Sequence, residues 1–410
     1  MFQPPPGWET IHAVVQEGVG TVFPAATLLV EQDGERLIHQ AYGCLDLGPC
    51  QYPTRLDSLF DLASLTKLFA ATAFMTLAEA GRVTLETPVV KVLPEFAGVR
   101  PIGITEDPLS HQPILPDPAF VGQSVDAGGI TFRRLLTHTS GLPGWTPLFR
   151  QGPQHDPVPT PDQVSPEARS ARISAIWTDT PFAYPTGKRL VYSDLGLILL
   201  GEAVARLADM PLESYLAQAV FGPLGLTHTA FNPTVNGFSA QEIAPTEVCA
   251  WRKRRCLGEV HDENAASLGG VAGHAGLFST AEDVAALGRM FLPRRPDFPN
   301  SNRSILSQAT VGTMTQAQAH QDGIERGLAW LRQGDDPTSI VATWGPESFG
   351  HTGFTGTSLW IDPDAQLLVV LLTNRVYGGR EPVGIMAFRR RLHAAIAAVL
   401  ATTAQGAQHG

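Results

Sequence analysis

The stretch ASLTKLFAATAFMTLAEA, residues 63–80, combines a long apolar helix pattern with a polar pair at its start. Ser64 and Lys67 stand three positions apart, so on a helix they share one face. A serine hydroxyl becomes an effective nucleophile when a neighbouring base takes its proton, and a partly desolvated lysine can be that base. The alternative is a structural role, because serine is favoured at helix starts. Ser64 and Lys67 are therefore candidates for a nucleophile and its activator.

Strand patterns lie at both ends of the chain. Residues 25–32 and 36–43 are apolar and β-prone, and Asp33-Gly34 between them is typical of a hairpin turn. The helix of 63–80 is expected to end at Gly81. Further strands are predicted near the C-terminus, followed by a last helix. These segments are 327–333, 358–362 and 367–373 for the strands and 382–400 for the helix.

Proline and glycine interrupt the middle of the chain at 93–130 and 141–165, which predicts long loops that line or cover a site. Helical patterns surround these loops. A helix is expected to begin at Ser165-Pro166, and others fit 195–207, 212–220 and 281–291.

Together these patterns predict an α/β fold of the α+β type, with an antiparallel sheet made from both chain ends, flanked by helices, and an inserted, mostly helical lobe. The expected domains are a sheet domain of 1–92 plus 310–402 and a helical domain of 93–309 with long loops. Residues 403–410 are expected to form a disordered tail.

Size and charge narrow the classes of function. A chain of 410 residues exceeds one typical core, and its 43% hydrophobic and 17% charged residues suit a soluble globular protein. The net charge of −10 argues against a nucleic-acid partner, and the basic runs 252–255 and 389–391 are expected to be solvated faces. We see no secretion signal and no apolar run of the roughly 18 residues that a membrane helix needs. We therefore expect a cytoplasmic protein without a membrane partner, unless a leader has been removed.

The cysteines form two near pairs, Cys44 with Cys50 and Cys249 with Cys256, too few for a disulfide scaffold in a chain of this length. We expect free thiols. A zinc site is the alternative, and its ligands would be Cys249, Cys256, His261 and Asp262. Because the gap between the cysteines is wider than in structural zinc sites, we expect no metal.

Two further motifs accompany Ser64-x-x-Lys67. Tyr192-Ser193-Asp194 stands just before a predicted helix, and His351-Thr352-Gly353 just before a predicted strand. In this order the motifs resemble the penicillin-recognising serine hydrolase family, which includes class C β-lactamases, D,D-peptidases and family VIII esterases. Its pattern is Ser-x-x-Lys, then Tyr-x-Asn, then Lys-Thr-Gly or His-Thr-Gly. Segments 135–142 and 270–280 also look familial, and 258–265 resembles a β-lactamase-like subgroup linked to cell-wall turnover.

The resemblance implies a β-lactamase/transpeptidase-like fold and a covalent acyl-enzyme that needs no cofactor. Ser64 would be the acylated nucleophile, with Lys67 and Tyr192 as its proton-transfer partners. The backbone N–H groups of Ser64 and Phe354 would form the oxyanion hole, where one donor is typically worth about 3 kcal/mol of transition-state stabilisation. The residues that would bind substrate are Asp194, His351, Thr352 and Gly353.

Asp194 departs from the asparagine of the family pattern. A carboxylate within about 4–6 Å of Lys67 would favour the protonated lysine. The charged Lys67 would then lower the pKa of Tyr192, which makes Tyr192 the expected proton acceptor from Ser64. The alternative is that Asp194 caps the following helix and points away from the site.

The other histidines carry less specific expectations. His351 replaces the lysine of the β-lactamase pattern and, with a reference pKa of about 6.5, would be mostly neutral at pH 7. Efficient β-lactam hydrolysis is then less expected than action on neutral esters or peptides. His138 and His274 are expected to be satisfied core histidines without a role in the reaction.

We therefore predict a serine hydrolase with carboxylesterase-type activity on small esters, with a D,D-peptidase or β-lactamase as alternatives. The expected partner is a small-molecule ester, peptide or lactam. A hypothesis from another class is a non-catalytic penicillin-binding module that senses cell-wall fragments. No Gly-x-Ser-x-Gly elbow, Walker loop or His-Glu-x-x-His motif is present, which argues against α/β-hydrolases, P-loop proteins and zincins.

Overall fold

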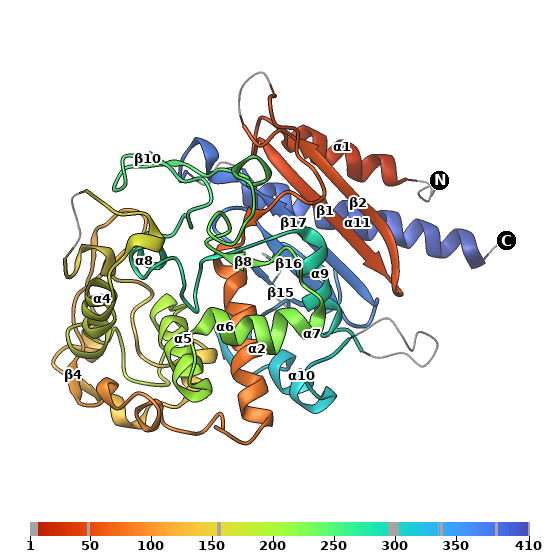
Figure 1. Ribbon diagram of the computed structural model, residues 1–410. Coiled ribbons are helices and arrows are strands. Elements are labelled where there is room, and N and C mark those ends of the chain that lie inside the picture. The colour runs from red at the N-terminus through yellow and green to blue at the C-terminus, as the bar shows by residue number, and fades with distance from the viewer. Residues whose placement is uncertain are drawn as a thin grey trace.

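An antiparallel sheet built from both ends of the chain is the centre of the molecule (Figure 1). The computed structural model describes residues 7–46, 50–153, 157–293, 303–334, 336, 339–381 and 384–408. In this part of the chain the sheet has eight strands, in the order β12-β13-β14-β15-β16-β17-β1-β2. The strands are β1 Ala25–Gln32, β2 Glu35–Gly43, β12 Ala319–Gln321, β13 Ile324–Arg326, β14 Leu331–Arg332, β15 Phe349–Thr352, β16 Ser358–Asp362 and β17 Leu367–Thr373.

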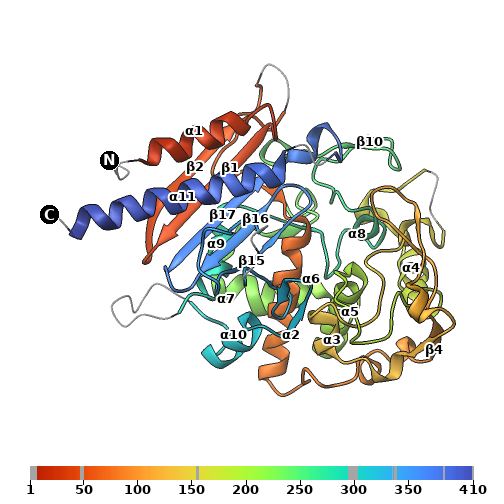
Figure 2. The same cartoon turned by 180° about the vertical axis from the view of Figure 1, so that it is seen from behind.

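The two central strands, β1 and β17, are apolar on both faces, and both faces are covered. Successive side chains of a strand point to opposite faces. Leu29 and Val370 therefore enter the core shared with the inserted helices, whereas Leu28 and Val369 enter a second core. Helices α1 (Trp8–Gly18) and α11 (Ile385–Gln408) supply the second core and lie side by side across that face (Figure 2).

Several predicted elements are confirmed. β1 and β2 form the predicted hairpin, with Asp33 and Gly34 at φ 53° and 78°. Strands β16 and β17 pair with each other at the predicted residues. The fold class, an antiparallel sheet flanked by helices, is thus as predicted.

The predicted strand 327–333 is wrong in its extent, because only Leu331–Arg332 is extended there. A Cβ on Gly327 would lie 2.2 Å from the Met314 carbonyl oxygen, and Ala329 has φ 64°. This close approach and this left-handed backbone turn the chain between β13 and β14, so that no single strand spans 327–333.

The regular structure between β2 and β12 is mainly helical. The helix α2 (Thr66–Glu79) follows β3 and is apolar on all sides, as befits a helix buried in the core. α2 packs against α5 (Asp194–Ala208) and is followed by Gly81 at φ 71°. The remaining helices are α3 Phe132–Leu136, α4 Pro166–Thr178, α6 Leu212–Leu216, α7 Gly222–Leu224, α8 Glu263–Ser267, α9 Ala281–Arg289 and α10 Gln308–Thr315.

The proline-rich stretches are irregular, as predicted, with small two-stranded pairs inside the first. Those strands are β4 Val99–Pro101, β5 Thr105–Glu106, β6 Pro113–Ile114 and β7 Ser124–Asp126. The proposed division of the chain at 92/93 and 309/310 stays a prediction. The predicted disordered tail differs from the structure, since α11 continues to Gln408; the predicted helix start at 382 lies outside the described residues.

A small three-stranded sheet leads into the turn that carries Ser64. Its strands are β3 (Phe60–Asp61), β11 (Leu277–Ser279) and β8 (Ala230–Phe231). After β3, Leu62 N donates to Leu277 O at 2.9 Å, and Ala63 N donates to the Asp61 carboxylate at 2.8 Å. These bonds fix the turn that leads into Ser64.

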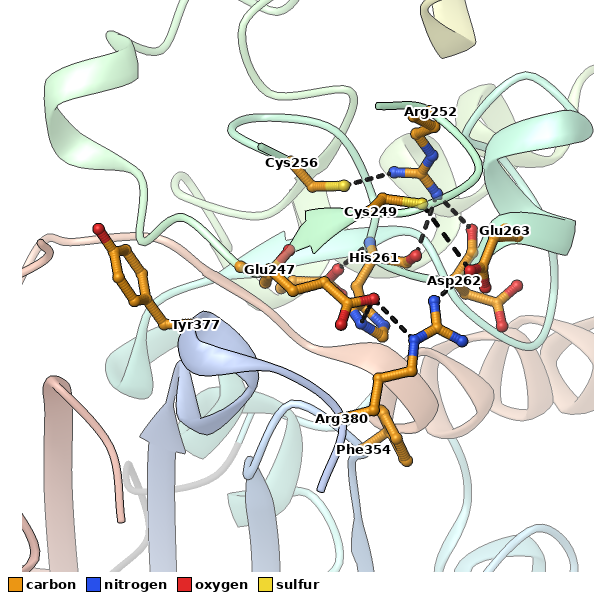
Figure 3. Close-up of polar contacts among 12 residues, drawn as sticks. Glu247, Cys249, Arg252, Cys256, His261, Asp262, Glu263, Phe354, Tyr377 and Arg380 are labelled. Atoms are coloured by element: carbon orange, nitrogen blue, oxygen red, sulfur yellow. Dashed lines mark hydrogen bonds and ion pairs between the residues drawn. The ribbon is translucent and has the colours of Figure 1, made fainter. Parts of the chain in front are cut away.

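The cysteines and the basic runs correct two expectations. Cys44 and Cys50 form a disulfide, whereas Cys249 and Cys256 are free, buried thiols, as predicted for that pair. In the hairpin of β9 (Val248–Cys249) and β10 (Arg254–Arg255), Arg252 of the first basic run is buried (Figure 3). Arg389 of the second run is also buried. Both guanidinium groups donate to backbone carbonyls, so neither run is simply a solvated face.

Among the described residues no helix is long and apolar enough to cross a membrane. No group of three or more side chains there has the arrangement of a metal site.

Candidate active site

Ser64 and Lys67 meet at the start of α2, as their spacing predicts. Ser64 lies in the short turn Ala63–Leu65, and Lys67 lies in the first turn of the helix. The Lys67 Nζ donates to Ser64 Oγ at 2.8 Å and to the His274 carbonyl oxygen at 3.0 Å. It also forms an ion pair with Asp194 Oδ1 at 2.7 Å. Because Lys67 is fully buried, these three contacts fix its ammonium group beside the serine hydroxyl.

Asp194 points toward this ammonium group and does not cap its helix. The cap of α5 is the preceding residue, Ser193, whose Oγ accepts from Gly196 N and donates to Pro143 O. Asp194 is the first residue of the helix, and its carboxylate is left to face Lys67. The alternative in which Asp194 points away is therefore wrong.

Tyr192 lies over the same ammonium group, between two histidine rings. Its ring centroid is 4.6 Å from that of His138, 5.8 Å from that of His351 and 4.9 Å from Lys67 Nζ. Its hydroxyl is buried, and no described residue offers it a hydrogen bond of ordinary geometry. Ser64 and Lys67 are nevertheless close enough to act on its pKa. The three motifs therefore converge on one point.

His138 does more than fill the core. Its Nδ1 accepts from Ser193 N at 3.0 Å, and its carbonyl oxygen accepts from Val191 N at 3.0 Å. Both contacts are made to residues adjacent to Tyr192, so His138 fixes the backbone that carries the phenol. The sequence offered a signal for this, since segment 135–142 looked familial, but it did not indicate a contact.

The protonation of the cluster differs from our prediction. Burial acts to lower the pKa of Lys67, but the Asp194 charge and Tyr192 outweigh it, so the pKa is raised. Burial and Asp194 raise the pKa of Tyr192, and Lys67 only partly opposes them. Lys67 thus acts on Tyr192 in the predicted direction, but the net shift is upward. At neutral pH the resting site holds an ammonium group and a neutral phenol.

A cluster in this state can accept the serine proton only after it has lost a proton itself. Replacing Asp194 with Asn should therefore move the acidic limb of Ser64 acylation to lower pH, since Asp194 raises the pKa of both Lys67 and Tyr192. The measurement is the rate of acylation by a p-nitrophenyl ester across about pH 5 to 10. The control is Asp283→Asn, which removes a buried carboxylate outside this cluster. An unchanged limb would contradict the electrostatic role of Asp194.

His351, Thr352 and Gly353 border the cleft on the other side. β15 is an interior strand of the sheet, because β14 pairs with it at Phe349 and Gly350. From His351 onward, β16 is its only strand partner among the described residues. Burial and the charges of Lys67 and Arg326 hold the pKa of His351 well below its usual range, so its imidazole is neutral at pH 7, as expected.

The turn after β15 is locked to the turn before Ser64. A Cβ on Gly353 would lie 2.1 Å from Thr357 Oγ1 and 2.6 Å from the Leu62 carbonyl oxygen, so only glycine fits there. Thr357 Oγ1 donates to that same carbonyl at 3.0 Å. The backbones of Ser64 and Phe354, the predicted oxyanion donors, are thus held in one rigid unit, although their role stays a prediction.

A cavity of about 370 Å³ opens over the nucleophile. Its lining includes Ser64, Tyr192, Arg326, Leu331, His351, Thr352, Gly353, Phe354, Arg375, Ile385, Met386 and Arg389. The sequence did not point to Arg326, because the short strand β13 carries no motif. The cavity thus combines a serine, a neighbouring phenol and three arginine side chains.

The chain is similar to known proteins over most of its length. A family model described as Beta-lactamase matches residues 11–393. An N-acetylmuramyl-L-alanine amidase of Bacillus subtilis is 32% identical over 392 residues, which cover 89% of this chain and 80% of the relative. A putative D-alanyl-D-alanine carboxypeptidase of Salmonella agona is 29% identical over 386 residues, or 88% of this chain and 81% of the relative.

The fold is also that of a solved structure. A penicillin-binding protein homologue of Caulobacter crescentus superposes with a TM-score of 0.67 at 19% identity, covering 97% of this chain and 99% of the homologue. The resemblance seen in the motifs is therefore confirmed at the level of fold and family. The chain belongs to the β-lactamase family of serine hydrolases.

Proposed function

We propose that the protein hydrolyses acyl compounds that carry a carboxylate near the scissile bond, with small esters and short peptides as the substrate class. The reaction would proceed through an acyl-enzyme on Ser64. The observation that carries this proposal is the buried guanidinium group of Arg326 in the wall of the cavity, whose Nε and Nη1 have no hydrogen-bond partner among the described residues.

Acylation begins when the cluster of Lys67 and Tyr192 has lost one proton. Ser64 Oγ attacks the carbonyl carbon and passes its proton to this cluster, while backbone N–H groups of Ser64 and Phe354 hold the oxyanion. The bond to the leaving group then breaks, and the cluster returns the proton to the departing oxygen or nitrogen. Water, deprotonated by the same cluster, releases the acid and restores Ser64.

Arg326 would bind an anion beside Ser64. It is only 8% exposed, and its Cζ lies 5.1 Å from the centroid of the Tyr192 ring. Its Nε and Nη1 have no hydrogen-bond partner among the described residues. A buried charge whose hydrogen bonds are incomplete is costly, and a carboxylate in the cavity would reduce that cost.

The other two arginines that line the cavity already donate hydrogen bonds to backbone carbonyl oxygens. Arg375 Nε donates to the Phe354 carbonyl oxygen at 2.8 Å. Arg389 Nη2 donates to the carbonyl oxygens of Gly353 and Thr357 at 3.0 and 2.7 Å. Both arginines thus hold the turn that follows β15, so we assign the binding of a ligand carboxylate to Arg326.

The names of two relatives favour a peptide-like substrate within this class. The relatives are called an amidase of N-acetylmuramyl-L-alanine and a carboxypeptidase of D-alanyl-D-alanine. A peptide that ends in D-alanine presents a free carboxylate on its leaving group, which Arg326 could bind. A small ester with a carboxylate on its acyl group offers the same charge.

Two matched pairs of substrates test the role of Arg326. The first pair is a diacetyl-lysyl-D-alanyl-D-alanine peptide and its C-terminal amide; the second is mono-p-nitrophenyl succinate and p-nitrophenyl butyrate. We expect the carboxylate member of at least one pair to be preferred, and Arg326→Gln to reduce that preference about 10- to 100-fold.

The control is Arg189→Gln, which removes a half-exposed arginine that pairs with Asp117. It should leave the preference intact. Equal rates for both members of both pairs in the unaltered protein would overturn the carboxylate proposal. Loss of the preference in the control as well would assign it to the overall charge and not to Arg326.

A further inference from the structure

Two familial segments, 258–265 and 270–280, meet next to the catalytic lysine without touching the cavity. Asp262 Oδ1 and His274 Nε2 lie 2.9 Å apart, and the His274 side chain is 1% exposed. His274 then contacts the site through its backbone, since its carbonyl oxygen accepts from Lys67 Nζ at 3.0 Å. The position of His274 therefore sets one of the three contacts that fix the ammonium group.

The backbone around His274 is tightly confined. A Cβ on Gly273 would lie 2.2 Å from the Leu197 carbonyl oxygen. Gly276 has φ 123°, and a Cβ there would lie 2.3 Å from the Gly270 carbonyl oxygen. The segment is thus held by close backbone packing on both sides of His274, and the histidine side chain is its polar anchor.

Asp262 is itself held in place. Its Oδ1 accepts from Ala265 N at 2.7 Å and caps α8. The buried Arg252 Nη2 donates to the carbonyl oxygens of His261 and Asp262 at 3.0 and 3.2 Å (Figure 3). Burial acts to raise the pKa of Asp262, but His274 outweighs it, so the net pKa is low and the group is a carboxylate.

We propose that Asp262 and His274 form a positioning pair that holds the Lys67 ammonium group against Ser64 through the His274 carbonyl oxygen. This inference rests on the proposed function of Ser64 as a nucleophile. The pair would touch no substrate. It acts through Lys67, whose alignment with Ser64 decides how readily the serine proton is taken.

The charged and titratable groups around Lys67 and Tyr192 must be known before a pH profile can be interpreted. They are Asp194 of α5, Tyr192 in the segment before α5, Arg326 of β13, His351 of β15 and His138 in the turn after α3. Asp262→Ala leaves all of these unaltered. A change in the profile of that variant would therefore report on the His274 contact.

The test uses the rate at which a fluorophosphonate labels the full-length protein, followed by intact mass. Ser64 Oγ forms a bond to phosphorus, fluoride leaves, and the serine proton passes to the cluster. In Asp262→Ala the limiting rate at saturating probe should fall about 100-fold, because a misplacement of about 1 Å can cost that much. The probe concentration for half-maximal labelling should change little.

The pH profile should change as well. The His274 carbonyl oxygen favours the charged form of Lys67, so losing it should move the acidic limb of labelling to lower pH. Asp262→Asn should restore both the rate and the limb, because its amide oxygen can still accept from His274 Nε2 and from Ala265 N. A loss of packing alone would lower the melting temperature without moving the limb.

Asp283→Asn is the matched control, since Asp283 is buried and accepts from His228 N and Thr229 Oγ1. It should cost stability but leave the labelling profile unchanged. If Asp262→Ala is labelled with the rate and limb of the unaltered protein, the positioning role is wrong. If the unaltered protein is not labelled at Ser64, the proposed function itself is wrong.

Discussion

Replacing Ser64 with Ala should lower the hydrolysis of p-nitrophenyl esters by about 10⁴-fold or more, because loss of a nucleophile removes the covalent route. The reason lies in the geometry, where Lys67 Nζ lies 2.8 Å from Ser64 Oγ and 2.7 Å from Asp194. No other described serine shares this contact with Lys67. The initial rate at saturating ester, compared with that of the unaltered protein, gives the result.

Ser58→Ala is the matched control for this experiment. Ser58 is buried near the start of β3, and its Oγ accepts from Arg55 N. The control should lose stability but keep its rate. If the Ser64 variant hydrolyses the ester at the unaltered rate while remaining folded, Ser64 is not the nucleophile.

Tyr192→Phe should lower the rate of acylation by about 10²- to 10⁴-fold, the usual contribution of a proton-transfer group. The substitution removes one oxygen and keeps the ring between His138 and His351, so packing changes little. Asp194→Asn should retain far more activity, because Lys67 then deprotonates more easily. Stopped-flow measurement of the first turnover separates acylation from release of the acid.

Tyr42→Phe serves as the control, since it removes another largely buried phenol, one that lies in the second core and whose hydroxyl contacts His12. Its acylation rate should match that of the unaltered protein. Near-normal acylation in Tyr192→Phe would remove Tyr192 from the proton-transfer cluster. Lys67 would then have to act alone.

Local sequence patterns predicted the elements whose contacts are short in range. The hairpin around Asp33-Gly34 and the strand pair 358–373 depend on alternation and turn residues within a few positions. The helix of 63–80 likewise follows from its own apolar run. Ser64, Lys67 and Tyr192 could be named in advance because their motifs stand in the order of the family pattern. The fold then brings the three motifs together.

The remaining features depend on contacts between distant segments. The strand predicted at 327–333 is interrupted by the Met314 carbonyl oxygen, which nothing in the local pattern reveals. Arg252 carries a charge that suits solvent, yet carbonyl oxygens of residues 260–262 accept its N–H groups in the interior. Arg326 lies over Tyr192 only because β13 brings it there, which no local pattern reveals.

The charge state of the site could not be predicted from the sequence either. From the residues alone, an ammonium group beside Tyr192 should lower the pKa of the phenol. In the folded protein the phenol hydroxyl is buried and also faces Asp194, and both effects act in the opposite direction. The sign of the net shift is thus set by burial, which a sequence does not provide.

The most direct measurement is to locate the residue that a fluorophosphonate modifies, by digestion and mass spectrometry of the folded protein. The account predicts one adduct, on the peptide that contains Ser64, and none in Ser64→Ala. An adduct on another residue, or no adduct on the folded protein, would contradict the account.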